Sequence, residues 1–281
     1  MATVRLDQKS RAIVRLISDS YINALANYFG SGPTDISVAR KQHRAYAEAL
    51  SSNGVEVTTL EADQNHPDCV FVEDQAVVID GHVLLPVPGH ESRRGEQPPI
   101  ADFLSHHLKG HQICKMEPPA MMDGGDILRL GDLFFVGRST RANDDGISEL
   151  KDLLDHLGHE LRVVDIPSGA LHLTSISSTP TDNIILAPEG YLAPEAFGVM
   201  PDGCEVIMIP EEEVYGCNTI GLPGNKVIIA EGYPTVKKTL EDRGLECIIL
   251  DMEQIRAADG SLTCCSTVSY THLTLPTILL V

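Results

Sequence analysis

The strongest constraint on the fold is an order of elements that repeats along the chain. Helical patterns recur about every fifty residues, and most are followed directly by a short run of β-forming residues. We expect helices at residues 38–53, 99–109, 144–157, 193–200 and 234–243. We expect strands after them at 55–60, 111–114, 161–166, 205–209 and 245–250, and paired strands before them, as at 126–130 with 133–136. The repeating unit is therefore strand, strand, helix, strand.

About five copies of this unit predict a closed, pseudo-symmetric α/β array with a central site rather than a doubly wound sheet. The third helix has the clearest local signals, because Asn143 can cap its start and Gly158 can end it. Ser37 is the expected cap of the first helix. The sequence has no G-x-G-x-x-G motif and no P-loop, so we expect no nucleotide cofactor.

Composition narrows the class of protein. With 281 residues, 43% of them hydrophobic and 22% charged, the chain can bury a full core as one large domain or two small ones. Its seven cysteines are odd in number and lack C-x-x-C spacing, which argues against a disulfide framework or a structural zinc site. The charged N-terminus does not resemble a signal peptide, and no segment reaches transmembrane length. These features predict a cytoplasmic protein.

The chain is strongly acidic, with 40 Asp and Glu against 21 Lys and Arg and a formal net charge of −19. Such a charge would repel nucleic acid and anionic membranes, and it would draw a small cationic ligand toward an acidic cleft. A solvated acidic surface without a specific ligand explains the same charge equally well. We expect a monomer or a homodimer.

Cys264 is the candidate nucleophile. It follows the turn signal Asp259-Gly260 and the extended pair Leu262-Thr263, so it is expected where a loop enters a strand. A thiol at that place can face a cleft and attack an electrophile. The alternative is a small buried hydrophobic residue, which is the commoner role of an unpaired cysteine.

Acidic residues gather in two other stretches. Asp68, Glu73 and Asp74 lie within a span of seven residues beside apolar strand residues, an arrangement that is costly if buried without a cation. A solvated turn is the alternative. In the second stretch, residues 123–126, two glycines between two aspartates would let the backbone approach a ligand closely. The alternative there is an ordinary turn.

One histidine and two arginines complete the set of candidates. His172 is flanked by Leu171 and Leu173 in a strand-like alternation, and could be a base or a hydrogen-bonded core residue. Arg93 and Arg141 each follow a turn or strand end, where a guanidinium could bind a carboxylate through two hydrogen bonds. The alternative is that both are surface arginines without a specific ligand.

The order and spacing of these stretches resemble those of the dimethylarginine dimethylaminohydrolases, a family of the guanidino-group-modifying (pentein) superfamily. The resemblance runs from about Ile13 to Ser266 and rests on residues 67–74, 91–94, 123–126, 134–137, 171–173 and 262–266 together with Arg141. It implies a five-bladed α/β propeller of ββαβ units around a central active site.

The resemblance also implies a role for each candidate. Cys264 would be the nucleophile, His172 the general acid and base, and Asp123 the residue that orients the imidazole. Asp123 stands where some relatives resemble a glutamate, which shortens its reach. Substrate contacts would come from Glu73 and Asp74 to the guanidinium, Asp68 to the α-amino group, Arg93 and Arg141 to the carboxylate, a lid near Leu25 and Ala26, and main chain near Ala258.

The implied reaction is hydrolysis of methylated arginine, either asymmetric dimethylarginine or monomethylarginine, to citrulline and an amine. It would pass through a covalent thiouronium on Cys264, and needs neither a cofactor nor a metal. Zinc bound by Cys264 and His172 would inhibit, since it would occupy the nucleophile. The alternatives are a deiminase acting on arginine or agmatine, an amidinotransferase, and a catalytically silent paralogue that acts through protein interaction.

The C-terminal segment differs from the rest of the chain. Residues 268–281 contain no acidic or basic residue apart from His272, and they resemble translated adapter sequence more than protein. We therefore expect a single catalytic domain over residues 1–267 and a non-native tail over 268–281. The exposed apolar run of such a tail would favour aggregation.

Overall fold

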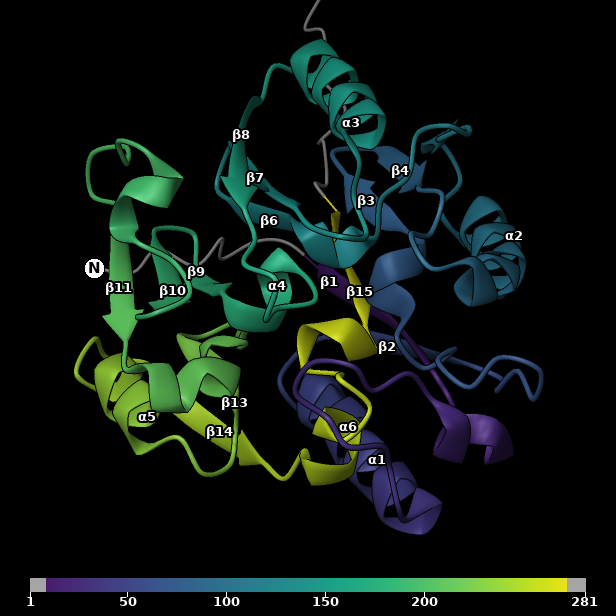
Figure 1. Cartoon of the computed structure of the whole chain (residues 1–281), viewed down its shortest axis with the longest axis horizontal. Coiled ribbons are helices and arrows are strands. Elements are labelled where there is room, and N and C mark those ends of the chain that lie inside the picture. Colours follow the sequence, from purple (N-terminus) through teal and green to yellow (C-terminus); the bar gives the residue numbers. More distant parts are fainter. Residues whose placement is uncertain (1–8, 272–281) are drawn as a thin grey trace, which may run out of the picture.

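In the computed structural model, which describes residues 9–271, five three-stranded sheets are arranged in a ring. Helices α1, α2, α3 and α5 lie at the periphery of this ring (Figure 1). In each sheet the middle strand pairs antiparallel with one neighbour and parallel with the other, and the parallel pair is joined by the connecting helix or turn. The closed α/β array of strand, strand, helix and strand predicted from the sequence is confirmed.

Four of the blades are each formed by one continuous stretch of the chain. The first blade takes its inner strand from the C-terminal end of the described residues. Its elements are β15 (Thr267–Thr271), β1 (Lys9–Arg15), α1 (Ile36–Ser52) and β2 (Glu56–Leu60). The second blade contains β3 (Val77–Ile79), β4 (His82–Leu85), α2 (Gln97–His107) and β5 (Gln112–Lys115). The third contains β6 (Ile127–Leu130), β7 (Leu133–Arg138), α3 (Asp144–Leu157) and β8 (Glu160–Asp165).

The last two blades are built in the same way. The fourth contains β9 (Ser178–Thr181), β10 (Ile184–Pro188) and β11 (Glu205–Ile209), and the fifth contains β12 (Ile220–Leu222), β13 (Lys226–Ala230), α5 (Pro234–Glu241) and β14 (Glu246–Leu250). In the fourth blade a short 3₁₀ helix, Pro194–Phe197, stands where we expected an α-helix over 193–200. That expectation was wrong because Pro194 starts the turn and Gly198, at φ +70°, ends it within four residues.

Helix caps explain where the longer helices begin. The Asn143 side chain accepts a hydrogen bond from the Gly146 amide at 2.8 Å, and Gly158 ends α3 in the left-handed conformation at φ +81°. Both were predicted correctly. For α1 the predicted cap was wrong, since Asp35 rather than Ser37 accepts from the first free amides. Ser37 instead donates its own amide to Asp35 at 2.9 Å.

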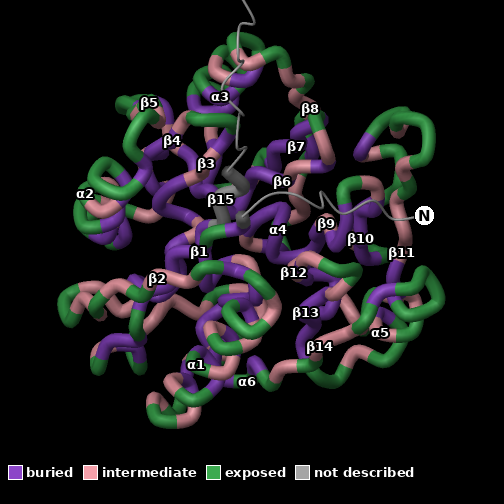
Figure 2. Tube along the Cα trace, turned by 180° about the vertical axis from the view of Figure 1, so that it is seen from behind, coloured by how far each residue is buried: buried purple, intermediate pink, exposed green. Residues whose placement is uncertain are grey.

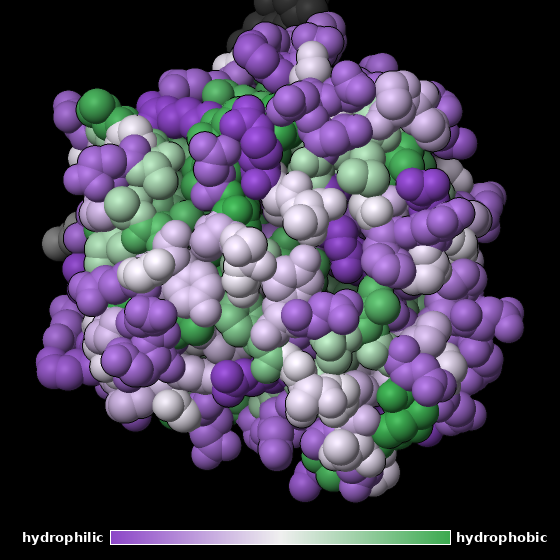
Figure 3. All heavy atoms as spheres, in the orientation of Figure 1, coloured by the Kyte–Doolittle hydropathy of each residue, from purple (hydrophilic) through white to green (hydrophobic). Residues whose placement is uncertain are grey.

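Apolar side chains fill the spaces between neighbouring blades. One such cluster joins Leu84 of β4, Phe134 of β7 and Leu150 of α3, all of them buried. Buried residues follow the strands and exposed residues lie mostly at the rim (Figure 2). Hydrophilic residues dominate the rim of the face seen in Figure 1 (Figure 3). Within residues 9–271, no helix has the length and apolar character needed to cross a membrane.

The inner strands of the five blades line a central cavity of about 290 Å³. Residues of β3, β6, β9, β12 and β15 all contribute to its wall. Glu73, Thr174 and Thr263 also line this cavity, and they belong to the segments that carry the candidate site. The centre of the propeller therefore contains a cavity next to these segments.

The ring is closed by strands from the two ends of the described chain. β15 pairs antiparallel with β1, in a register that runs from Lys9 opposite Thr271 to Ile13 opposite Thr267. The backbone of residues 268–271, which we assigned to a non-native tail, therefore lies within the first blade. The rest of that segment lies outside the described residues, and its foreign origin and the domain boundary at 267 stay predictions.

Candidate active site

A small cavity of about 20 Å³ brings together most of the residues singled out from the sequence. It lies apart from the wall of the larger central cavity, with which it shares no lining residue. The predicted site residues that line it are Leu25, Asp68, Asp74, Arg93, Arg141, His172, Ala258 and Cys264. Glu73, Asp123 and the half-buried Ala26 do not line it. A space of this size holds about one water molecule.

Short helical turns, not strands, carry the chemical groups. Cys264 lies in the 3₁₀ helix η7 (Thr263–Cys265), and His172 is the N-cap of the four-residue helix α4 (Leu173–Ile176). Cys264 was expected where a loop enters a strand, and it lies in a turn three residues before β15 begins at Thr267. The extended conformation expected at Leu262-Thr263 was wrong, because Leu262 has right-handed helical backbone angles. The strand-like alternation around His172 does not mark a strand either, because a helix follows it. The apolar neighbours of these residues are buried because the segments cross the centre of the ring, so their alternation does not reflect a β-strand. Asp123 precedes a similar turn, η4 (Gly124–Asp126).

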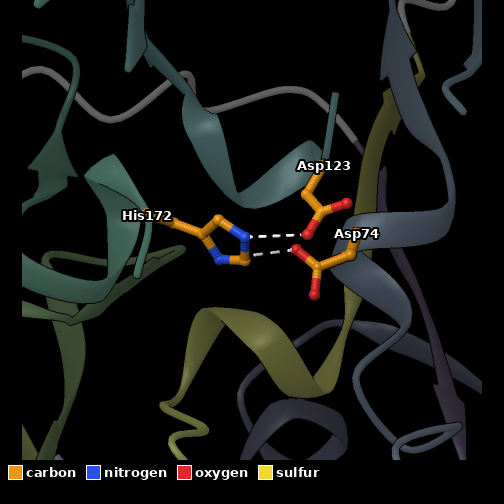
Figure 4. Close-up of side chains that lie close together, drawn as sticks. All are labelled: Asp74, Asp123 and His172. Atoms are coloured by element: carbon orange, nitrogen blue, oxygen red, sulfur yellow. Dashed lines mark hydrogen bonds and ion pairs between the residues drawn. The ribbon is translucent and has the colours of Figure 1, made fainter. Parts of the chain in front are cut away.

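His172 points toward two aspartates from two other elements (Figure 4). Its Nε2 lies 2.9 Å from Oδ2 of Asp123, and its Nδ1 lies 3.8 Å from Oδ1 of Asp74. All three side chains are buried. Asp123 is held in turn by the Gly89 amide at 2.7 Å and by Nη1 of Arg141 at 3.2 Å. These contacts fix the orientation of the imidazole ring in the structure, and the role that the resemblance implies for Asp123 stays a prediction.

The charges around His172 shift its titration. Burial alone would lower the pKa of His172, but Asp74 and the hydrogen bond to Asp123 outweigh it and raise the pKa to about 9. The same pairing holds the pKa of Asp123 well below its usual range, although burial opposes this. Near neutral pH His172 is therefore an imidazolium held between two carboxylates. It can give up a proton to a departing amine.

Two adjacent glycines allow these groups to approach one another. A Cβ on Gly124 would lie 2.1 Å from the carbonyl oxygen of Glu73, and a Cβ on Gly125 would lie 2.7 Å from Nδ1 of His172. The Gly125 amide also donates to Oδ1 of Asp74 at 3.1 Å. The sequence predicted close approach at this pair, but to a ligand. The close neighbours in the structure are protein atoms of the site itself.

The Cys264 thiol is fully buried and lies beside hydrogen-bonding groups. Its sulfur is 3.2 Å from Oγ of Ser261. Burial raises the pKa of the thiol well above its usual value, and the charges of Glu73 and Asp74 raise it further. The resting side chain is therefore a thiol and not a thiolate.

Glu73 occupies the partition between the two cavities. It lies in η2 (Val72–Gln75), is half-buried, and lines the central cavity rather than the small one. Its Oε2 accepts a hydrogen bond from Oγ1 of Thr263 at 2.9 Å. Burial, followed by the neighbouring charge of Asp74, raises the pKa of Glu73 to about 8. A cation bound next to it would favour its ionised form.

The two candidate arginines have different surroundings. Arg93 is buried in a network: it pairs with Asp74 at 2.5 Å and Glu96 at 2.8 Å, and it donates to the main-chain oxygen of Phe71 at 2.9 Å. Arg141 forms an ion pair with Asp123 at 3.2 Å and also lines the small cavity. Asp68, the expected partner of an α-amino group, accepts the Leu25 amide at 3.0 Å.

His172, Asp74 and Asp123 are also the residues whose geometry could suit a metal ion. Their candidate ligand atoms lie within 4.8 Å of one another. Cys264 does not belong to this cluster among the described residues, so inhibition by zinc at Cys264 and His172 stays a prediction. The imidazolium supplies a positive charge between the carboxylates, which satisfies them without a metal.

Sequence reasoning missed a buried residue, Asn218, that connects the segment of His172 with the segment of Cys264. The side-chain nitrogen of Asn218 donates to the carbonyl of Thr174 at 2.6 Å and to Oγ1 of Thr263 at 2.9 Å. Its oxygen accepts the Thr263 amide at 3.1 Å. One amide group thereby ties α4, which follows His172, to η7, which contains Cys264. A single Asn between predicted strands carries no signal of such a role.

Comparison with known proteins identifies the family. The family described as N,N dimethylarginine dimethylhydrolase, eukaryotic, matches residues 19–269. The N(G),N(G)-dimethylarginine dimethylaminohydrolase of Pseudomonas aeruginosa is 33% identical over 236 residues, which cover 84% of this chain and 90% of that relative. The protein of the same name from Streptomyces coelicolor is 31% identical over 258 residues, covering 91% and 95%. This chain belongs to the dimethylarginine dimethylaminohydrolase family.

Solved structures agree with this membership. A dimethylarginine dimethylaminohydrolase crystallised as an adduct with S-methyl-L-thiocitrulline superposes with a TM-score of 0.85 at 30% identity, over 93% of this chain and 100% of that one. A Pseudomonas aeruginosa variant in complex with citrulline gives 0.83 at 31% identity, over 93% and 99%. These comparisons confirm the family resemblance seen in the sequence. They also confirm the five-bladed propeller that the resemblance implied.

Proposed function

We propose that this chain hydrolyses Nω-methylated arginine, as asymmetric dimethylarginine or monomethylarginine, to citrulline and a methylated amine. The observation that carries the proposal is the small cavity, which places Cys264 and His172 beside Asp74 at one site and adds Arg141 and Asp68 to its wall. A guanidinium carbon is a weak electrophile, so it needs carboxylates to hold the planar group and a strong nucleophile to attack it.

The first half of the reaction forms the covalent intermediate. The guanidinium binds against the Asp74 and Glu73 carboxylates, and its positive charge lowers the pKa of the neighbouring Cys264 thiol. The thiol loses its proton to solvent as the sulfur bonds to the guanidinium carbon, and the balance closes when the released amine takes up a proton from solvent. The imidazolium of His172 donates a proton to the methylated nitrogen, the carbon–nitrogen bond breaks, and the amine leaves.

The second half uses water. Neutral His172 takes a proton from a water molecule that attacks the thiouronium carbon, the carbon–sulfur bond breaks, and citrulline forms with the Cys264 thiol restored. Asp123 keeps the imidazole oriented in both halves, in the way that a buried carboxylate orients the histidine of a catalytic triad. One residue thus acts first as acid and then as base.

The amino-acid end of the substrate would meet the opposite part of the cavity wall. Arg141 is suited to the carboxylate, because it lines the cavity and its guanidinium is fixed by Asp123. Asp68 is suited to the α-amino group, together with main chain near Ala258. In the conformation described, Arg93 uses its guanidinium to hold Asp74 and Glu96. A role for Arg93 on the carboxylate would require part of this network to rearrange.

The test is a comparison of substrates. Purified protein is incubated separately with asymmetric dimethylarginine, monomethylarginine, arginine and agmatine, and citrulline or carbamoylputrescine is measured together with the released amine. We expect citrulline and dimethylamine in equal amounts from asymmetric dimethylarginine. Cys264→Ser should abolish this turnover, whereas Cys265→Ser, which changes the adjacent buried thiol, should retain it. Faster release of ammonia from arginine or agmatine would instead assign a deiminase.

A further inference from the structure

We propose that Asp259 is a positioning residue for this reaction, which latches one loop over the small cavity and thereby sets the affinity for the substrate. The loop comprises residues 24–32 and is called the cavity loop below. The inference rests on the proposed function for its substrate, but the latch itself follows from contacts that do not depend on any substrate. Asp259 is separate from the residues assigned to the chemistry.

The Asp259 carboxylate accepts hydrogen bonds from four consecutive amides of the cavity loop. Oδ2 accepts from Asn27 and from Tyr28 at 3.0 Å, and Oδ1 accepts from Phe29 at 2.7 Å and from Gly30 at 2.6 Å. The side chain is only 6% exposed. Hydrogen bonds from amides to a carboxylate are stronger than those between neutral groups, and four of them here depend on one side chain.

The cavity loop crosses the site and contacts the third and fourth blades as well as two segments that connect blades. Leu25 lines the cavity and its amide is held by Asp68, while the Gly32 amide donates to the carbonyl of Ala257 at 2.8 Å. Between these ends, the Tyr28 hydroxyl lies 3.1 Å from Oγ1 of Thr140, next to Arg141 in the third blade. The Phe29 ring lies 6.3 Å from that of Tyr191 in the fourth blade. The loop therefore spans the cavity rather than lying beside it.

The size of the cavity shows why such a loop must open. About 20 Å³ is enough for one water molecule and far too little for an amino acid with a guanidinium side chain. Because Leu25, Ala258 and Asp259 all contribute to the cavity wall, releasing the cavity loop from Asp259 would remove one side of it. Substrate entry and product exit then require this contact to break and re-form.

The backbone of Asp259 allows a clean substitution. Asp259 has φ +57°, in the left-handed region that Asp and Asn adopt more readily than other side chains. Asp259→Asn therefore keeps the backbone while it replaces one accepting oxygen by an amide nitrogen that faces N–H groups. Asp80→Asn is the matched control: Asp80 also has positive φ, at +40°, but its carboxylate binds Arg129 and His159 away from the site.

The first measurement is steady-state turnover of asymmetric dimethylarginine by the full chain. We expect Asp259→Asn to raise KM at least tenfold relative to Asp80→Asn, with kcat changed less than threefold, because the latch acts on binding and not on the reacting groups. The second measurement is the rate at which iodoacetamide alkylates Cys264 in the substrate-free protein, located by peptide mass mapping. This rate should rise at least fivefold in Asp259→Asn.

A second variant tests the same contact from the loop side. A Cβ on Gly30 would fall 2.2 Å from the carbonyl oxygen of Ala257, so Gly30→Ala should push the cavity loop outward without changing Asp259. We expect the same rise in KM and in alkylation. Unchanged KM and alkylation in either folded variant would overturn the latch. Since alkylation needs no turnover, the latch can fail or succeed independently of the proposed reaction.

Discussion

Replacing Gly125 by alanine should impair the chemistry without unfolding the protein. The added Cβ would lie 2.7 Å from Nδ1 of His172 and 2.8 Å from Oδ1 of Asp74, whereas ordinary contacts begin at 3.4 Å. The imidazole must therefore shift by about 0.7 Å. Because a misplacement of ~1 Å costs about a hundredfold, we expect kcat to fall roughly 10- to 50-fold, which is about 2 kcal/mol of transition-state stabilisation.

The assay is citrulline formation from asymmetric dimethylarginine at saturating substrate, with thermal unfolding measured on the same samples. Gly169→Ala is the matched control, because Gly169 lies three residues before His172 and its Cβ would have a single neighbour, Cε1 of Tyr191 at 3.8 Å. The control should keep normal kcat, and Gly125→Ala should unfold within a few degrees of it. A folded Gly125→Ala protein with kcat within twofold of Gly169→Ala would refute the steric reasoning.

Three further predictions concern titration and recognition. Plotted against pH, kcat/KM should rise through pH 8 or so as Glu73, with a pKa of about 8, ionises, and it should fall above about pH 9 as His172 loses its proton. Glu73→Gln should remove the rise on the acidic side of this profile. A rise that persists in the variant would show that another group titrates there. Alkylation of Cys264 should be slow in the substrate-free protein, because burial and the nearby carboxylates raise the pKa of the thiol. A small unreactive amidine should accelerate the alkylation, because its positive charge favours the thiolate. An unchanged rate would argue against ionisation of the thiol by the substrate. Arg141→Ala should weaken binding of methylarginine by roughly 2–5 kcal/mol. Agmatine, which has no carboxylate, should be a poor substrate of the unmodified protein and of Arg141→Ala alike. Equal turnover of agmatine and methylarginine by the unmodified protein would exclude the carboxylate contact.

The regular part of the fold could be predicted because its signals are local. The helix from Asp144 to Leu157 has its cap at Asn143 and its stop at Gly158, and its buried face repeats over four turns, so neighbouring residues alone determine it. Repetition of similar units then leaves few ways to bury their faces. This is why the order of strands and helices, and the closed array, followed from the sequence.

The segments that cross the centre of the ring could not be read in the same way. α4 has four residues and η7 has three, which is too short for a hydrophobic period to distinguish a helix from a strand. Burial on all sides also makes the residues around His172 and Cys264 apolar whatever their backbone conformation. The structure brings most of the residues singled out from the sequence to one cavity, but the backbone conformation that presents them was not predicted.

Contacts between distant segments were beyond prediction for a different reason. Asp259 binds amides of residues 27–30, and Asn218 joins Thr174 to Thr263 across 44 and 45 residues. Backbone amides carry no side-chain identity, so nothing in the sequence of residues 27–30 indicates that they bind a carboxylate. Asp259-Gly260 was read as a turn, and its second role depends on where the turn lies in the ring.

The pairing of β15 with β1 has a consequence for synthesis on the ribosome. β1 and β2 emerge early, whereas β15 emerges only after the other four blades. With about 250 residues between Arg15 and Thr267 and translation at roughly 5–20 residues per second, β1 waits on the order of tens of seconds for its partner. Cys264 is translated just before β15, so this cysteine and the strand that closes the ring leave the ribosome almost together. During that wait β1 presents an unpaired edge that the β15 of a neighbouring nascent chain fits equally well, and we expect strand exchange between chains to be the main route of misassembly.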